Sequence, residues 1–147
     1  MLKKKVYFGG PWFNQQQEEE HSRLYDLLKD KYDVFTPKLA GVVSKDTKLD
    51  LMSLLFLGNL KAMNEAQIVI AITDGKDMGT IWESGYSYAN KKPIIYYCET
   101  LGSNKFNLML AKTGLVARNE EELLALLEDA ASWQYHAVDE SYHGDIE

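Results

Sequence analysis

The chain has a single cysteine, Cys98, among its 147 residues. An intramolecular disulfide is therefore excluded, which fits a reducing compartment, and we predict a cytoplasmic location. The three lysines near the start are not followed by a long apolar run. This pattern predicts neither a signal peptide nor a membrane-spanning segment. Three histidines and one cysteine offer no cluster with metal-ligand spacing, so we expect no bound metal.

Positive charge is also scarce, since the formal net charge is −6 and no basic stripe runs along the sequence. Proteins that bind nucleic acid present basic surfaces, so DNA and RNA are not expected partners. A small molecule or a second subunit is the expected partner instead. Hydrophobic residues make up 46% of the chain, which is enough for a buried core. The length predicts one domain over residues 1–147, in which residues 132–147 form a C-terminal tail without clear periodicity.

Short β-branched and aromatic runs alternate with amphipathic segments along the chain. Strands are predicted at residues 4–8, 33–36, 66–72, 93–98 and 115–117. Helices are predicted at residues 14–31, 47–65, 80–90 and 119–131, with a loop at 38–47 and a helical turn at 107–112. This alternation predicts an α/β fold in which helices cover both faces of a parallel sheet. Ligands of such folds bind in the loops that follow the strands.

The loop after the third predicted strand leads into a helix and carries three carboxylates, among them Asp77, with Glu83 in the first helical turn. Thr80 and Glu83 have the spacing of a capping box, in which Glu83 reaches back to the backbone of Thr80. Alternatively, Glu83 is a carboxylate nucleophile and Asp77 a second acid of the same pocket. Glycosyl transfer needs a carboxylate that traps an oxocarbenium-like sugar, together with an acid for the leaving group.

The first predicted strand ends at Tyr7 and Phe8, and Gly9, Gly10, Pro11, Trp12 and Phe13 follow it. One interpretation is a tight turn whose aromatic side chains cap the core. The other is a binding loop, in which Gly9 and Gly10 allow the backbone to approach a ligand and aromatic rings enclose a planar base. In that case the Tyr7 hydroxyl would orient a carboxylate.

Two asparagines are further candidates. Asn59 lies in a very apolar predicted helix, where an amide is either a satisfied core group or a donor that faces a ligand. Asn107 precedes a helical turn, where asparagine is a common N-cap. The three histidines lie in contexts that look exposed, and we assign them no role.

Four motifs resemble the nucleoside 2-deoxyribosyltransferase family, and they occur in family order over roughly residues 3 to 117. The resemblance rests on Tyr7-Phe8-Gly9-Gly10-Pro11-Trp12-Phe13, Gly58-Asn59-Leu60-Lys61-Ala62-Met63, Asp77-Met78-Gly79-Thr80-Ile81-Trp82-Glu83-Ser84-Gly85-Tyr86, and Phe106-Asn107-Leu108-Met109-Leu110. Each motif alone is weak, but four in order are specific. The resemblance implies a flavodoxin-like parallel sheet flanked by helices.

The resemblance also implies roles for individual residues. Glu83 corresponds to the family's nucleophile, Asp77 to an aspartate that contacts the deoxyribose hydroxyls, and Tyr7 to a tyrosine that orients the nucleophile. Asn107 corresponds to an asparagine that reaches the sugar in a neighbouring subunit's site. Asn59 occupies a position that is aspartate in some relatives, where it is a candidate acid for the leaving base; asparagine has no proton to give at neutral pH.

Gly9, Gly10 and Phe13 complete the expected substrate-binding set. The implied reaction transfers 2-deoxyribose between free nucleobases and 2′-deoxynucleosides, without a cofactor, through a covalent deoxyribosyl-Glu83 intermediate, in a role in nucleotide salvage. Two alternatives are also compatible with the sequence. One is a nucleoside or nucleotide N-glycosidase of the same fold, in which water replaces the acceptor base. The other is a nucleotide-binding module without catalytic activity.

The predicted helix at 47–65 is apolar around most of its circumference, and such a helix must be buried on nearly all sides. A single domain of this size covers one face of an outer helix, so we expect a symmetric pairing of this helix with its copy. The resemblance agrees, because active members of the family are commonly hexamers built from dimers. The alternative is that the tail, with Trp133 and Tyr135, folds over this helix within one chain.

Overall fold

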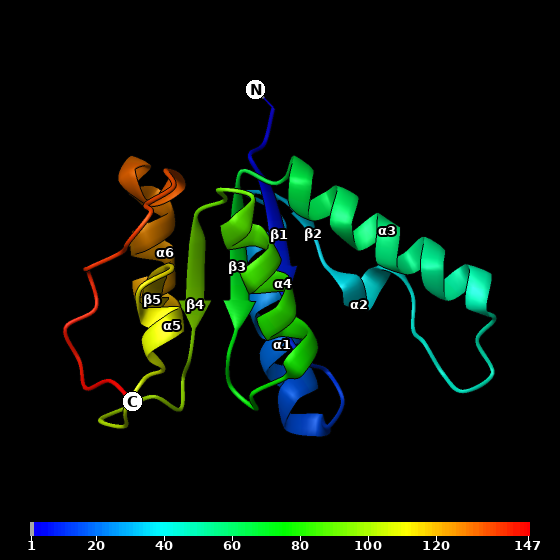
Figure 1. Cartoon of the computed structure of the whole chain (residues 1–147), viewed down its shortest axis with the longest axis horizontal. Helices are drawn as coiled ribbons and strands as arrows, with labels where there is room; N and C mark the ends of the chain where they lie inside the picture. The colour runs from blue at the N-terminus through cyan, green and yellow to red at the C-terminus, as the bar shows by residue number, and fades with distance from the viewer. Residues whose placement is uncertain (1) are drawn as a thin grey trace.

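The computed structural model describes residues 2–147, and its centre is one sheet of five parallel strands (Figure 1). The strands are β1 (Lys5–Gly9), β2 (Asp33–Phe35), β3 (Ile68–Ile72), β4 (Ile94–Tyr97) and β5 (Leu115–Ala117). Their order across the sheet is β2-β1-β3-β4-β5. This is the flavodoxin-like order, so the predicted fold class is confirmed. The chain reverses its direction of winding between β1 and β3, where ligands of such sheets bind.

Helices separate the strands along the chain. They are α1 (Gln15–Leu28), α2 (Pro37–Ala40), α3 (Leu49–Glu65), α4 (Met78–Ala89), α5 (Leu108–Ala111) and α6 (Glu120–Glu128), followed by the 3₁₀ helix η1 (Ala130–Trp133). The prediction of a loop at 38–47 was wrong at its start, because α2 begins at Pro37. The fixed φ of proline favours the first position of a helix, where its missing N–H costs no intrahelical hydrogen bond.

Alternate side chains of the strands are buried on opposite faces of the sheet. Val6 and Phe8 of β1 point to one face, where Leu24 and Leu28 of α1 and Leu123 and Leu127 of α6 complete the core. Tyr7 points to the opposite face, where the core includes Met63 of α3, Ala111 of α5 and, at its edge, Tyr86 of α4. The central strand β3 is buried along its whole length. Helices therefore cover both faces of the sheet.

The C-terminal tail does not cover α3. Trp133 packs against Tyr32 with ring centroids 5.7 Å apart, and its indole N–H donates to the carbonyl of Leu127 at 2.9 Å. Tyr135 packs against Tyr88 at 5.6 Å. The alternative in which the tail folds over the 47–65 helix was therefore wrong.

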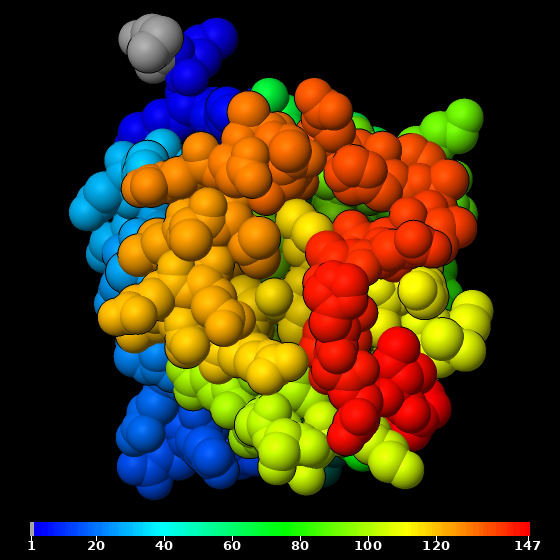
Figure 2. Space-filling view, turned by 90° about the vertical axis from the view of Figure 1, so that its left-hand side faces the viewer, coloured from blue at the N-terminus to red at the C-terminus, as the bar shows by residue number. Residues whose placement is uncertain are grey.

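The tail instead lies along α5, on the side of the molecule away from α3 (Figures 1 and 2). The Phe106 N–H donates to the carbonyl of Asp145 at 2.9 Å, and the Glu147 N–H donates to the carbonyl of Phe106 at 2.9 Å. The Leu108 N–H donates to the carbonyl of Glu147 at 3.0 Å. The last residues are thus fixed beside the segment that contains Asn107.

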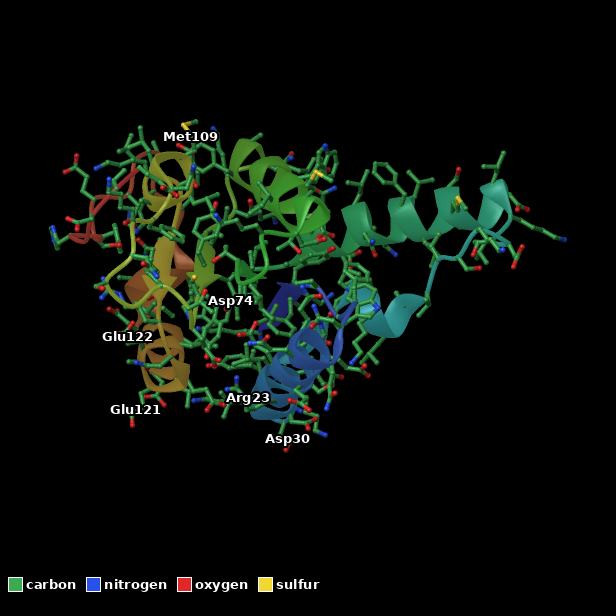
Figure 3. All side chains as sticks on the ribbon, turned by 90° about the horizontal axis from the view of Figure 1, so that it is seen from below. Arg23, Asp30, Asp74, Met109, Glu121 and Glu122 are labelled. Atoms are coloured by element: carbon green, nitrogen blue, oxygen red, sulfur yellow. The ribbon has the colours of Figure 1, made fainter. Side chains whose placement is uncertain are left out.

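Helix α3 extends away from the rest of the chain (Figures 1 and 3). Of the 17 residues of α3, only Met63 is buried. Five of its large apolar side chains are exposed by 47–81%, namely Leu49, Leu51, Leu54, Phe56 and Leu57. Exposed apolar patches of this kind are common at protein–protein interfaces and around ligand-binding grooves. Among residues 2–147, no helix is both long and apolar enough to span a bilayer.

Candidate active site

A cavity of about 320 Å³ opens at the carboxyl ends of β1 and β3. Its volume is at the lower end of the range for small-molecule pockets. Loops after β1 and β3 and the helices α3 and α4 supply its walls. It is lined by Gly10, Trp12, Phe13, Pro37, Phe56, Asn59, Leu60, Met63, Asp77, Gly79, Thr80, Trp82 and Glu83. A larger hollow lies at the amino ends of β1 and β2, but it holds none of the candidate site residues.

Asp77 is the N-cap of α4. One oxygen of its carboxylate accepts hydrogen bonds from the Thr80 N–H at 2.9 Å and from the Thr80 hydroxyl at 2.8 Å. The expected capping box was therefore wrong, because Asp77 caps a helix that begins two residues before Thr80. An aspartate one helical turn earlier satisfies the same N–H group, and Glu83 is left free of the capping role.

A hydrogen bond from Tyr7 holds the Glu83 side chain in place. The Tyr7 ring is fully buried in the middle of β1, and its hydroxyl donates to Oε2 of Glu83. A Cβ atom on Gly9 would lie 3.1 Å from Oε1 of Glu83, so a larger residue there would press on the carboxylate. Strand β1 therefore fixes one oxygen of Glu83 and, through Gly9, makes room for the other.

Burial raises the pKa of Glu83 to about 7, while the Tyr7 hydrogen bond lowers this pKa and the charge of Asp77 raises it. Burial, together with the Glu83 charge, also raises the pKa of Tyr7 far above its usual value, so Tyr7 remains a donor. A carboxylate with this pKa is about half ionised near pH 7 and fully ionised at alkaline pH. It is poorly solvated, which suits an attack on an electron-deficient carbon.

Two pairs of aromatic rings border the cavity. Trp12 and Phe13 lie with centroids 5.0 Å apart on the loop after β1. The ring centroids of Phe56 of α3 and Trp82 of α4 lie 5.8 Å apart, on the wall that these two helices form. Aromatic faces and a small number of polar groups are typical of sites that bind flat heterocyclic ligands.

Gly10 also belongs to this site for a steric reason. A Cβ atom at this position would lie 2.7–3.0 Å from three side-chain atoms of Ile72, which real Cβ atoms almost never do. Glycine therefore lets the loop after β1 pack directly on the end of β3. This packing places Trp12 and Phe13 at the cavity.

The structure brings most of the predicted site residues together, with one exception. Gly10, Phe13, Asn59, Asp77 and Glu83 line the cavity. Tyr7 and Gly9 do not line the cavity, but they lie next to the Glu83 carboxylate.

Asn107 does not line the cavity. It caps α5 instead, by accepting hydrogen bonds from the N–H groups of Met109 at 2.9 Å and Leu110 at 3.2 Å. Asn107 is exposed, and the apolar side chains of Leu108 and Met109 beside it are exposed by 47% and 69%.

Phe56 and Trp82 also belong to the site, although neither was predicted there. In the sequence both read as ordinary apolar positions of helices, and only the crossing of α3 and α4 places them beside one another. His21 was also misjudged, because it is buried: it lies 4.8 Å from Phe8 and 6.1 Å from Trp12 between ring centroids. Burial lowers the pKa of His21 to about 4, so this ring supports the Trp12 side of the cavity as a neutral group.

Within residues 2–147, no group of three or more histidine, cysteine, aspartate or glutamate side chains is arranged to hold a metal ion.

A second acidic cluster lies outside the cavity, around Asp74. Asp74 accepts hydrogen bonds from the N–H of Glu99 at 3.0 Å and from the N–H of Thr100 at 2.8 Å. Burial and the adjacent Asp74 carboxylate raise the pKa of Glu20 to about 8, although Arg23 opposes the shift.

This raised pKa predicts how stability depends on pH. Between about pH 4.5 and 8, folded Glu20 holds a proton that the unfolded chain releases, so its contribution to stability is lost as the pH rises through this window. We expect Glu20→Gln to flatten part of the decrease in the free energy of unfolding between about pH 4.5 and 8, measured by urea denaturation. Glu19→Gln, on the exposed side of α1, is the control and should leave the slope unchanged. Equal slopes in all three proteins would contradict the prediction.

The chain matches one family model and is similar to several solved structures. The family model of nucleoside 2-deoxyribosyltransferase matches residues 6–127. No curated protein matches the chain. A solved 2-deoxyribosyltransferase from the psychrotolerant bacterium Bacillus psychrosaccharolyticus is 25% identical, with a TM-score of 0.69 over 89% of this chain and 96% of that chain.

Two further structures share the fold. A 2-deoxyribosyltransferase from Leishmania mexicana is 21% identical, with a TM-score of 0.60 over 83% of this chain and 95% of that chain. A CMP N-glycosidase from Clostridium botulinum is 21% identical, with a TM-score of 0.51 over 84% of this chain and 98% of that chain. The neighbours of this fold thus include a transferase and a hydrolase.

Proposed function

This chain belongs to the nucleoside 2-deoxyribosyltransferase family, and on that premise we propose that it transfers 2-deoxyribose between nucleobases through a covalent link to Glu83. The observation that carries the proposal is the pairing of a poorly solvated carboxylate with a buried tyrosine at the floor of an aromatic cavity. The pairing holds Glu83 in one orientation, and the cavity has room for a sugar beside it.

The proposed reaction is a double displacement. Oxygen Oε1 of Glu83 attacks C1′ of a 2′-deoxynucleoside from the face opposite the base, and the bond from C1′ to the base nitrogen breaks. The electron pair of that bond leaves with the base, which then takes up a proton. A nitrogen of a second base attacks C1′ of the deoxyribosyl ester, loses its proton, and releases the Glu83 carboxylate. Each displacement inverts C1′, so the β configuration is retained overall.

The charge of the cavity supports a substrate without a 5′-phosphate. Among the residues that line it there are two carboxylates, Asp77 and Glu83, and no lysine, arginine or histidine. A phosphate dianion beside two carboxylates would be repelled, since Coulomb interactions are strong where water is excluded. The cavity therefore favours nucleosides over nucleotides, which distinguishes it in chemistry from a site for a nucleoside monophosphate.

The alternative of an N-glycosidase has one specific observation in its favour, which is the shared fold with the CMP N-glycosidase. Isotope exchange separates the two reactions. We expect labelled adenine to enter deoxyadenosine, or labelled cytosine to enter deoxycytidine, when the protein is present. Base release at a rate that does not depend on added base, without entry of label, would identify a hydrolase. No reaction of either kind would leave a module without catalytic activity.

The sugar preference provides a further prediction. A 2′-hydroxyl withdraws electrons from C1′ and destabilises an oxocarbenium-like transition state, so 2′-deoxynucleosides should react far faster than ribonucleosides. We expect kcat/KM for deoxyadenosine to exceed that for adenosine by at least about a hundredfold, which corresponds to roughly 2.7 kcal/mol in the barrier. Equal values for the two substrates would contradict the assignment.

We also propose that the active unit is an oligomer in which α3 pairs with its copy and Asn107 serves a neighbour's cavity. The exposed apolar side chains of α3 and the position of Asn107 outside its own cavity support this proposal. Glu83→Gln and Asn107→Ala proteins should each be inactive alone and should regain part of the activity after they are unfolded and refolded together. Sedimentation that finds a fully active monomer at the assay concentration would contradict the proposal.

A further inference from the structure

One polar side chain of the cavity has no partner. Asn59, on α3, lines the cavity together with Asp77 and Glu83, and its Oδ1 atom is buried without a hydrogen bond to any described residue. A buried amide oxygen without a donor costs roughly 1–3 kcal/mol, and folded proteins rarely leave one unpaired. The position of Asn59 therefore requires an explanation.

Each of the other hydroxyl and carboxylate side chains that line the cavity already makes at least one hydrogen bond. The Thr80 hydroxyl donates to Asp77 at 2.8 Å, and Oε2 of Glu83 accepts from Tyr7. The rest of the lining is glycine, proline, or apolar and aromatic residues. Asn59 is therefore the one side chain of this lining with an uncommitted donor and an uncommitted acceptor, which makes it suited to read a neutral polar ligand.

An amide reads a ligand edge on which a donor lies next to an acceptor. This holds for either orientation of the amide, because rotation by 180° only exchanges its two ends. Adenine presents such an edge, with the N6 amino group as donor and N7 as acceptor, and asparagine pairs with it through two hydrogen bonds. A 6-oxopurine presents two acceptors there, O6 and N7, so one end of the amide would face an acceptor with its own lone pair.

We propose that Asn59 selects 6-aminopurines over 6-oxopurines, by accepting from the N6 amino group and donating to N7. This inference rests on the proposed function and names the preferred leaving base. As the bond to C1′ breaks, negative charge spreads over the five-membered ring of the departing purine, including N7. The hydrogen bond to N7 then strengthens, so Asn59 stabilises the transition state more than the bound substrate without giving up a proton.

The test compares the release of adenine from deoxyadenosine with the release of hypoxanthine from deoxyinosine. Release is followed in the first turnover and without an acceptor base, so only the first displacement is observed. The readout is the ratio of the two rates in each protein, because the intrinsic leaving abilities of the bases cancel when proteins are compared. We expect Asn59→Ala to lower the adenine-to-hypoxanthine ratio by about tenfold or more, the effect of roughly 1.4 kcal/mol.

Asn64→Ala is the matched control, because Asn64 lies on the same helix, pairs with Tyr86 at 3.0 Å, and does not line the cavity. Its ratio should equal that of the wild type. As a readout independent of turnover, calorimetry should show that Asn59→Ala loses affinity for free adenine and not for hypoxanthine.

An unchanged ratio in Asn59→Ala would overturn the inference, and base release itself would leave the proposed function standing. Base release from deoxycytidine with none from deoxyadenosine would also overturn the inference and leave the proposed function standing. No release from any deoxynucleoside by the wild-type protein would overturn the proposed function and the inference together.

Discussion

Replacing Glu83 by glutamine is expected to lower base exchange by at least three orders of magnitude, on the scale seen when an enzyme loses its nucleophile. Glutamine keeps the size of the side chain but cannot form the ester with C1′. The assay is incorporation of labelled base into deoxynucleoside at pH 8. A Glu83→Gln protein that exchanges bases within tenfold of the wild-type rate would contradict covalent catalysis.

The same variant provides its own control for folding. Because the pKa of folded Glu83 is raised to about 7, the stability that this group contributes is present below its unfolded pKa and is lost as the pH rises through 7. Glu83→Gln should therefore be at least as resistant to urea as the wild type at pH 8, and its advantage should shrink at pH 5. Loss of activity with gain of stability identifies a residue that serves the reaction.

Replacing Tyr7 by phenylalanine is expected to lower kcat/KM at pH 7 by about 10- to 100-fold. The hydroxyl of Tyr7 donates to ionised Glu83, and hydrogen bonds to charged groups contribute about 1.5–3 kcal/mol. Because this bond favours the carboxylate, its removal raises the pKa of Glu83 above 7. The acid limb of the kcat/KM profile should therefore move to higher pH by about one to two units.

Tyr97→Phe is the matched control for this experiment. The Tyr97 hydroxyl donates to Glu99 at 2.5 Å, and neither residue lines the cavity. Its pH profile should match the wild type. If Tyr7→Phe lost activity equally at all pH values, the tyrosine would act in orientation alone, and the proposed control of Glu83 ionisation would be wrong.

The fold could be predicted from the sequence because the apolar runs are short and well separated. The run at residues 68–72 is apolar at every position, as a strand buried on both faces must be, and the alternation with helices then leaves a parallel sheet. The order of the strands was implied only by the resemblance. Periodicity does not state which strands are neighbours, since that depends on how the helices between them cross the sheet.

The parts of the site that depend on one chain segment could also be anticipated. Tyr7 and Gly9 belong to the first strand, and Gly10 follows it directly. The capping of α4 could not be anticipated, because Asp77 and Glu83 both have suitable spacings relative to Thr80. Asp77 caps in the structure because the helix starts at Met78.

The contacts that join distant segments were not predictable by periodicity. Phe56 and Trp82 are 26 positions apart and meet only because α3 crosses α4. The tail was misjudged for a similar reason. Its pairing with Phe106 is a main-chain contact, and main-chain hydrogen bonds leave little trace in the identity of side chains.

Mass spectrometry of the protein after incubation with a deoxynucleoside, without acceptor base, tests the covalent link most directly. The account predicts that a fraction of the wild-type protein gains the mass of one deoxyribosyl group, that the adduct lies on the peptide containing Glu83, and that added base removes it. Glu83→Gln should show no adduct under the same conditions. Base exchange by a wild-type protein that forms no adduct, or an adduct on any other residue, would contradict the account.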